Sequence, residues 1–110
     1  MDSTITLIVT GGPLTGHKFV FAEPATCLIG RSCHCTITLP QVIECLDVSR
    51  QHCLLEIAPP SLRVRDLGSL NGTYVNRQAR LTVGAPQDLK DGDEIIIGKT
   101  FFKVLVEPVS

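Results

Sequence analysis

Short apolar stretches alternate with turn-forming residues along the whole chain. In residues 4–10, Ile5, Leu7 and Val9 occupy every second position and threonines fill most of the positions between them. This period of two is typical of a strand with one buried face, because successive side chains of a strand point to opposite sides. Similar patterns predict further strands at residues 17–21, 26–29, 36–39, 53–57, 62–65, 73–75, 81–83, 94–97 and 101–106.

Turn signals separate these segments. A Gly-Gly-Pro at residues 11–13 follows the first predicted strand, and a Pro-Pro-Ser at residues 59–61 follows the fifth. No stretch has a convincing helical period. About ten or eleven short strands divided by frequent turns are typical of an antiparallel sandwich. We therefore predict an all-β fold, an antiparallel β-sandwich whose exposed loops carry any ligand chemistry.

The size of the chain limits the number of domains. A length of 110 residues suits one domain with a single core, and a hydrophobic content of 44% is that of a globular protein. We expect residues 1–110 to form a single domain.

Charge and hydropathy bear on partners and location. Ten Lys and Arg against eleven Asp and Glu give a formal net charge of -1, which lacks the basic excess expected of a nucleic-acid-binding protein. No apolar run approaches the ~20 residues of a membrane span, and the first residues lack the features of a signal peptide. We therefore expect no nucleic acid and no membrane partner, and a cytoplasmic location.

The cysteines are odd in number, and several fall where a strand would point a small apolar side chain inward. We interpret them as reduced thiols. One arrangement, Cys33-His34-Cys35, has metal-ligand composition, but it lacks the second ligand pair of a structural zinc site. No metal and no cofactor are expected. The five cysteines are Cys27, Cys33, Cys35, Cys45 and Cys53.

A tight turn with many polar side chains lies in residues 66–76. Its centre is Asn71-Gly72, a pair that tolerates positive φ and commonly joins two strands in a primed hairpin turn or an αL bulge. Taken alone, this pair predicts only a turn.

Three short motifs occur in a fixed order around that turn. They are Gly-Arg at residues 30–31, Ser-Arg-x-His at residues 49–52 and Asn-Gly-Thr-x-Val-Asn at residues 71–76. Together with the Gly-Asp-x-Ile-x-x-Gly of residues 92–98, the ordered set resembles the forkhead-associated (FHA) domain family. Each motif is common by chance, but the set is specific and spans almost the whole chain.

The resemblance implies a signalling module for protein–protein interaction. FHA domains are β-sandwiches that recognise phosphothreonine in partner proteins. The resemblance therefore implies that the ligand-binding loops lie at one end of the sandwich. The implied partner is a threonine-phosphorylated protein or peptide, a substrate of a Ser/Thr kinase.

Four residues are the principal binding candidates by this resemblance. A phosphothreonine carries roughly -1.5 to -2 charges and three strong acceptor oxygens, so its receptor needs converging donors. Arg31 would supply a guanidinium fork and Ser49 a hydroxyl. Arg50 would reach the phosphate through its side chain or backbone, and Asn71 would bond the main chain of the ligand.

Other motif residues are expected to support the loops. His52 is interpreted as a scaffold residue whose ring bonds the loop backbone, and Gly30, Gly72 and Asn76 as further structural support. Thr73 is also expected to be mainly structural, with a peripheral ligand contact.

Three positions are expected at the periphery of the ligand surface. Many family members carry Ser or Thr where this chain has Leu70, so one phosphate donor is missing, and Ser69 is a candidate to replace it. Leu70 leaves two outcomes open, a weaker phosphate affinity or a partner with an apolar side chain there. Asp47 is expected to favour a basic ligand side chain, unless it pairs with Arg50.

Two alternative functions remain open from the sequence. One is a scaffold of the FHA fold that binds a partner surface independently of phosphate. The other is a hydrolase, because Asp47, Ser49 and His52 have the composition of a catalytic triad. A triad is defined by geometry and not by closeness in sequence, so we predict that the chain is not an enzyme.

Overall fold

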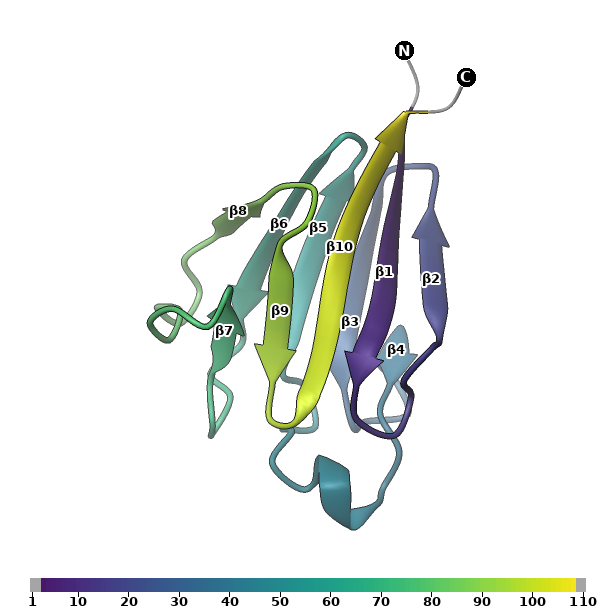
Figure 1. Ribbon diagram of the computed structural model, residues 1–110. Helices are drawn as coiled ribbons and strands as arrows, with labels where there is room; N and C mark the ends of the chain where they lie inside the picture. The colour runs from purple at the N-terminus through teal and green to yellow at the C-terminus, as the bar shows by residue number, and fades with distance from the viewer. Residues whose placement is uncertain (1–2, 109–110) are drawn as a thin grey trace.

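The computed structural model describes residues 3–108, which form two five-stranded sheets packed face to face (Figure 1). One sheet has the order β2-β1-β10-β9-β7, with β2 (Lys18–Phe21), β1 (Ser3–Gly11), β10 (Thr100–Pro108), β9 (Glu94–Ile97) and β7 (Thr73–Val75). The other has the order β4-β3-β5-β6-β8, with β4 (Ile37–Thr38), β3 (Ala25–Gly30), β5 (Cys53–Ala58), β6 (Ser61–Asp66) and β8 (Gln87–Leu89). The predicted β-sandwich is confirmed.

Strand alternation builds the core between the two sheets. Ile5, Leu7 and Val9 of β1 are almost fully buried, as their period of two predicts, and they oppose apolar residues of β10 across an antiparallel ladder. From the other sheet, Ile29 and Leu55 point into the same core. Because the two longest strands, β1 and β10, come from opposite ends of the described chain, their pairing closes the fold. A single domain over residues 1–110 stays a prediction, and its bounds include residues outside the described part.

The prediction of a strand at residues 81–83 is wrong. Residues 80 and 83 form only isolated bridges, Arg80 to Tyr74 and Val83 to Asp66, which lie on two different strands. The strand in this region is β8, which pairs antiparallel with β6 through Leu89 and Leu62. Leu81 and Val83, two apolar residues at alternate positions, satisfied the sequence pattern, but no neighbouring strand offers a ladder there.

The turn at Asn71-Gly72 is not a hairpin, which was one of the two forms that the sequence left open. The strands it connects, β6 and β7, belong to different sheets, so the loop crosses from one layer of the sandwich to the other. The conformational part of the prediction is correct, since Gly72 has a φ of 90°. One pairing also departs from the antiparallel pattern, because β3 and β4 are parallel.

The helical content of residues 3–108 is limited to one short 3-10 turn, η1 (Ile43–Cys45). It lies in the loop between β4 and β5. Within the described residues, no helix has the length and hydropathy to cross a membrane.

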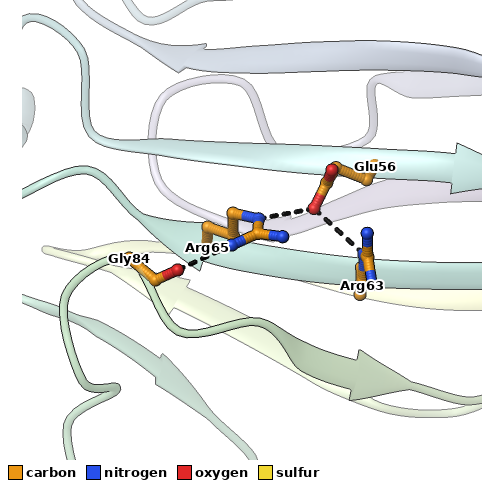
Figure 2. A network of polar contacts seen from close by, with 4 residues as sticks. All are labelled: Glu56, Arg63, Arg65 and Gly84. Carbon is orange, nitrogen blue, oxygen red and sulfur yellow. Dashed lines mark hydrogen bonds and ion pairs between the residues drawn. The ribbon is translucent and has the colours of Figure 1, made fainter.

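The outer face of the second sheet carries a charged network (Figure 2). Glu56 Oε1 accepts from Arg65 Nε at 2.6 Å and from Arg63 Nε at 3.0 Å, and Arg65 Nη1 donates to the carbonyl oxygen of Gly84 at 2.7 Å. The hydrogen bond from Arg65 and the second one from Arg63 lower the pKa of Glu56. The arginines of β6 therefore lie on the outer face of the sheet, as the alternation predicts. Their charges are paired with the carboxylate of Glu56.

The loops that carry the sequence motifs gather at one end of the sandwich (Figure 1). Residues 31–36 follow β3, residues 39–52 connect β4 to β5, and residues 67–72 connect β6 to β7. In Figure 1 all three lie at the lower end, opposite the start of β1 and the end of β10.

Candidate functional site

The first two motif loops meet through a close backbone approach at Gly30. A Cβ atom at this position would lie 2.2 Å from the carbonyl oxygen of Arg50, so only glycine fits. Beyond this point the backbone N–H of Arg31 donates to the Ser49 carbonyl at 3.2 Å, and that of Ser32 donates to the Arg50 carbonyl at 2.9 Å. The Cys35 thiol donates to the same Arg50 carbonyl at 3.2 Å. The Gly-Arg motif thereby fixes the position of the Ser-Arg motif.

The guanidinium of Arg31 is held in place by neighbouring acceptors. Its Nε donates to the carbonyl of Val48, and its Nη1 donates to Gln41 Oε1 at 2.9 Å. The side-chain amide of Gln41 in turn donates to the Arg31 carbonyl at 2.6 Å. A guanidinium carries five N–H donors, so these two bonds orient the group and leave further donors for an anion. The side chain of Gln41 was not predicted to contribute to the site.

The hydroxyl of Ser49 links the second loop to the third. Its Oγ accepts a hydrogen bond from the backbone N–H of Leu70 at 3.0 Å. A serine hydroxyl can accept and donate at the same time. Because the Oγ is used here as an acceptor, its own proton is free to be donated to an acceptor outside the loop. The residue is only half-buried, so such an acceptor can approach from solvent.

His52 lies fully buried between the loops and bonds backbone groups with both ring nitrogens. Nδ1 accepts from the Ser49 N–H at 3.0 Å, which places the ring proton on Nε2, and Nε2 donates to the Gly72 carbonyl at 2.7 Å. Neither nitrogen is bonded to the Ser49 hydroxyl. The arrangement is that of a scaffold histidine joining the second and third loops.

The buried His52 makes stability dependent on pH. Burial lowers the pKa of the imidazole below its ordinary 6.5, more than the bond to Gly72 raises it. In the unfolded chain the ring takes up a proton below pH 6.5, whereas the folded state resists it. We therefore expect the free energy of unfolding to fall as the pH drops below about 6.5. Urea unfolding at pH 8, 7, 6 and 5.5 measures this.

The contribution of His52 can be separated from those of other groups. His52→Gln should reduce the slope of stability against pH between 7 and 5.5, while His34→Gln, which alters an exposed histidine, serves as the matched control. Equal slopes for wild type and His52→Gln would show that this ring does not produce the effect.

Asn71 lies at the solvent-exposed crest of the third loop. Its Nδ2 donates to the main-chain carbonyl of Asp47 at 2.9 Å, which is a third link between the second and third loops, after those of Ser49 and His52. Asp47 and Arg50 are both exposed, and within residues 3–108 no ion pair joins them. The pairing considered from the sequence is therefore absent in the described residues, and both side chains face solvent near the site.

A buried carboxylate organises the third loop from below. Asp66 is fully buried and accepts four hydrogen bonds, from the backbone N–H groups of Gly68 and Ser69 and from the hydroxyls of Ser69 and Thr73, at 2.5 to 3.1 Å. Burial alone would raise the pKa of Asp66, but these hydrogen bonds together lower it. The carboxylate is thus kept charged under the loop and fixes its shape.

Comparison with known proteins identifies the family. A family model of the FHA domain matches residues 27–98. The chain belongs to the FHA domain family. This confirms the resemblance seen in the three sequence motifs.

Named relatives and a solved structure support the same family. The chain is 40% identical over 104 residues to an oxoglutarate dehydrogenase inhibitor of Corynebacterium efficiens, covering 94% of this chain and 67% of that protein. It is 38% identical over 107 residues to the glycogen accumulation regulator GarA of Mycolicibacterium smegmatis, covering 94% and 60%. A structure from a study of phosphothreonine-dependent FHA domain interactions is 29% identical, with a TM-score of 0.79 over 96% of this chain and 99% of that one. The chain therefore spans about two thirds of the length of these two relatives.

The FHA fold brings most of the predicted site residues together. Hydrogen bonds and close approaches connect Gly30, Arg31 and Ser49 on the first two loops. Further bonds connect these loops to Asn71 and Gly72 on the third. Arg50 lies beside Ser49 with an exposed side chain. The motifs of the sequence therefore correspond to one surface.

Two residues expected at the periphery of the ligand surface lie beneath it instead. The hydroxyl of Ser69 is buried, donates to Asp66 and accepts from the Gly72 N–H at 3.0 Å. That of Thr73 is also buried and bonded to Asp66. Ser69 consequently does not replace the donor that is missing at Leu70, which itself is 82% exposed.

Asn76 is the one supporting residue that lies away from this surface. It follows β7 at the end opposite Gly72, has a φ of 54°, and its side chain bonds Asp93 and the backbone N–H of Glu94 at 2.9 Å each. It holds β7 against the start of β9 and has no contact with the three loops through these bonds.

Three residues that support the FHA loops were not predicted from the sequence. Asp66 and Gln41 were not recognised, and neither was Arg80, whose Nη2 donates to the Ser69 carbonyl at 2.6 Å. Arg80 also packs on Gly72, where an added Cβ would lie 2.7 Å from its Nε. An aspartate two residues before a Gly-Ser pair was the only available signal, because such a carboxylate commonly bonds the backbone N–H groups of a turn.

Proposed function

We propose that this chain is a phosphothreonine-dependent interaction module that docks phosphorylated segments of partner proteins on its three loops. One observation carries the proposal: the Arg31 guanidinium and the Ser49 hydroxyl are each held by internal hydrogen bonds that leave donors unused. Preorganised, partly exposed donors of this kind suit a phosphate, which offers only acceptors.

Each exposed residue of the surface has a distinct proposed role. Arg31 and Ser49 bind the phosphate, and Arg50 adds a second positive charge beside them. Asn71, whose amide N–H already bonds the Asp47 carbonyl, offers its side-chain oxygen to a main-chain N–H of the ligand. Asp47 then lies where it can tune preference for basic ligand residues, by ~0.2 to 1 kcal/mol for an exposed pair.

The module is proposed to bind without catalysis. Both ring nitrogens of His52 are bonded to backbone groups, so the imidazole has no position from which to accept the Ser49 proton, as a hydrolytic triad requires. Inhibitor and regulator are the names of two relatives, which also favours a binding role. The proposed partner is a Ser/Thr kinase substrate, met in the cytoplasm by a single domain of residues 1–110.

A peptide-binding experiment tests this function. A phosphothreonine peptide library, its unphosphorylated counterpart and a phosphoserine version are titrated against the protein by fluorescence anisotropy. Binding of the phosphothreonine library, with weaker binding of the phosphoserine version and none of the unphosphorylated counterpart, supports the proposal. Phosphothreonine should exceed phosphoserine because burying one methyl group is worth about 0.8 kcal/mol. Equal binding of phosphorylated and unphosphorylated threonine peptides contradicts it.

An alternative function is supported by Leu70. Its side chain is 82% exposed at the position beside Asn71, which suits a scaffold that binds a partner surface independently of phosphate. Treating a captured partner with phosphatase separates the two functions. Release of the partner supports the phosphate-dependent module, and retention supports the scaffold.

Ser49→Ala is expected to weaken phosphopeptide binding by roughly 1 to 2 kcal/mol, the value of one hydrogen bond. The loss follows from removing the free hydroxyl proton, since the Leu70 N–H that loses its acceptor is near solvent. Isothermal titration calorimetry measures it. Ser61→Ala, at an exposed serine of β6, is the matched control, and an unchanged affinity for Ser49→Ala removes this residue from the site.

A further inference from the structure

Exposed apolar side chains are concentrated on the loops of the proposed binding surface. Among residues 3–108, seven large apolar side chains are exposed, and five of them belong to two loops at one end of the sandwich. This distribution is far from even, and we call these five the apolar rim. They are Val42 (38% exposed), Ile43 (78%), Leu46 (59%), Leu67 (41%) and Leu70 (82%).

The segment that carries Val42, Ile43 and Leu46 is anchored at both of its ends. Before it, Gln41 exchanges two hydrogen bonds with Arg31. After it, the carbonyl of Asp47 accepts from Asn71, and that of Val48 accepts from Arg31. The fold therefore holds these apolar side chains in solvent, at an energetic cost that a simple connection would not require.

A further anchor lies inside the segment, between the two anchored ends. Cys45 is fully buried, and the backbone N–H of Cys45 donates to the Val42 carbonyl at 2.9 Å. The Val48 N–H donates to the Cys45 carbonyl at 3.0 Å. Because one side chain of the turn is buried, its neighbours Ile43 and Leu46 are directed outward.

Hydrogen bonds place the two halves of the apolar rim beside each other. Leu46 precedes Asp47 and Leu70 precedes Asn71, and Asp47 and Asn71 are joined at 2.9 Å. The Leu70 N–H is also bonded to the Ser49 hydroxyl. The rim is thus continuous with the two residues proposed to bind the phosphate and the ligand main chain.

We propose that the apolar rim binds large apolar side chains of the ligand that flank its phosphothreonine. The inference rests on the proposed function and names the ligand class: a phosphothreonine segment whose flanks carry Leu, Ile, Met or Phe. An extended chain advances about 3.3 Å per residue, so a segment held at Ser49 and Asn71 reaches the rim within a few residues. The charged residues between positions 41 and 48 are Glu44 and Asp47, which disfavours acidic flanks.

The test compares flanks on a constant phosphothreonine. A peptide with Gly and Ser at all flanking positions is the reference, and Leu is placed at each flanking position in turn. Leu at one or more positions should raise the affinity of wild-type protein at least fivefold, whereas Glu at the same position should not. In the double variant Leu46→Ser, Leu70→Ala the gain should disappear, and the reference peptide should bind as before, because alanine at position 70 removes the apolar side chain without adding a phosphate donor.

A matched control variant uses an exposed apolar residue elsewhere. Val20→Ser removes a side chain that is 63% exposed on β2, and the gain from Leu should persist in it. Circular dichroism and thermal unfolding confirm that each variant is folded.

Several outcomes overturn the inference. Equal affinity for peptides with all flanks overturns this inference. The proposed function still stands in that case if the reference phosphopeptide binds and its unphosphorylated form does not. If the gain in affinity from Leu persists in the double variant, residues outside the apolar rim bind the Leu side chain, and the inference is wrong. If sedimentation shows a wild-type dimer that the double variant abolishes, the rim is a self-association surface instead. Failure of every phosphopeptide to bind overturns the proposed function, and this inference with it.

Discussion

Replacing Asp66 with alanine is expected to lower the free energy of unfolding by about 3 kcal/mol or more, the cost of leaving several buried polar groups without partners. The fully buried carboxylate is the common acceptor for two hydroxyls, of Ser69 and Thr73, and for two backbone N–H groups. Ser69 and Thr73 are buried, so solvent does not satisfy their hydroxyls when the carboxylate is removed. Urea unfolding of both proteins at neutral pH measures the loss.

Two further variants, Asp66→Asn and Asp88→Ala, test whether the loss of stability comes from the buried acceptor oxygens of Asp66. Asn has nearly the shape of Asp but turns one acceptor oxygen into a donor, so an intermediate loss is expected. Asp88 is an exposed carboxylate, and its removal should change stability by less than about 0.5 kcal/mol. A similarly small change for Asp66→Ala would mean that the loop is held by Arg80 and the backbone alone.

The same carboxylate predicts a loss of stability in acid. Its hydrogen bonds lower its pKa below the ordinary 3.8, so its contribution is complete above pH 3.8 and is lost as the pH falls through the lowered value. His52 acts in a higher window, below pH 6.5. Both residues hold the loop of Leu70 and Asn71, so ligand affinity should decline together with stability.

The strands that could be predicted from sequence are those rich in β-branched and aromatic residues. Residues 73–75 and 94–97 were predicted with the same bounds that β7 and β9 have. Their Thr, Tyr, Val and Ile residues are all of types enriched in strands, a signal present in the sequence itself. β8 has the sequence Gln-Asp-Leu, and only its pairing with β6 makes it a strand. Such a strand depends on tertiary contacts that no local pattern records.

The turn at Asn71-Gly72 shows a similar division. The positive φ of Gly72 follows from residue chemistry and was predicted. Whether the flanking strands pair depends on which sheet each one joins, and here they join different sheets. Local propensity therefore predicted the positive φ at Gly72 but not which sheet each flanking strand joins.

The residues of the candidate site could be located because they belong to a recognisable motif set, whereas their support could not. Gln41 bonds a residue 10 positions earlier in the chain, and Arg80 bonds one 11 positions earlier. Exposed glutamines and arginines are ordinary in loops, so neither stands out in the sequence. The apolar rim could not be located from the sequence either. Val42, Ile43 and Leu46 are residue types typical of a core, and only the structure shows that they are exposed.

Arg31→Ala is expected to weaken phosphopeptide binding by about 2 to 4 kcal/mol, the range for breaking a charge-assisted pair in a partly desolvated site. This corresponds to about 30-fold or more in affinity. The guanidinium is half-buried and oriented by Val48 and Gln41, so it loses little conformational freedom when it binds a phosphate. Calorimetric titration with a phosphothreonine peptide measures the change.

Three further variants show whether the loss belongs to phosphate recognition. Arg31→Lys keeps the charge but not the planar fork, so a smaller loss is expected than for alanine. Arg63→Ala removes one positive charge from the outer face of the second sheet, where Arg63 pairs with Glu56, and should leave affinity unchanged. Arg50→Ala removes an exposed charge beside Ser49 and should cost less than Arg31→Ala, because solvent screens it. If folded Arg31→Ala binds within twofold of wild type while Arg50→Ala does not bind, the phosphate is held by Arg50 and the roles of the two arginines are reversed.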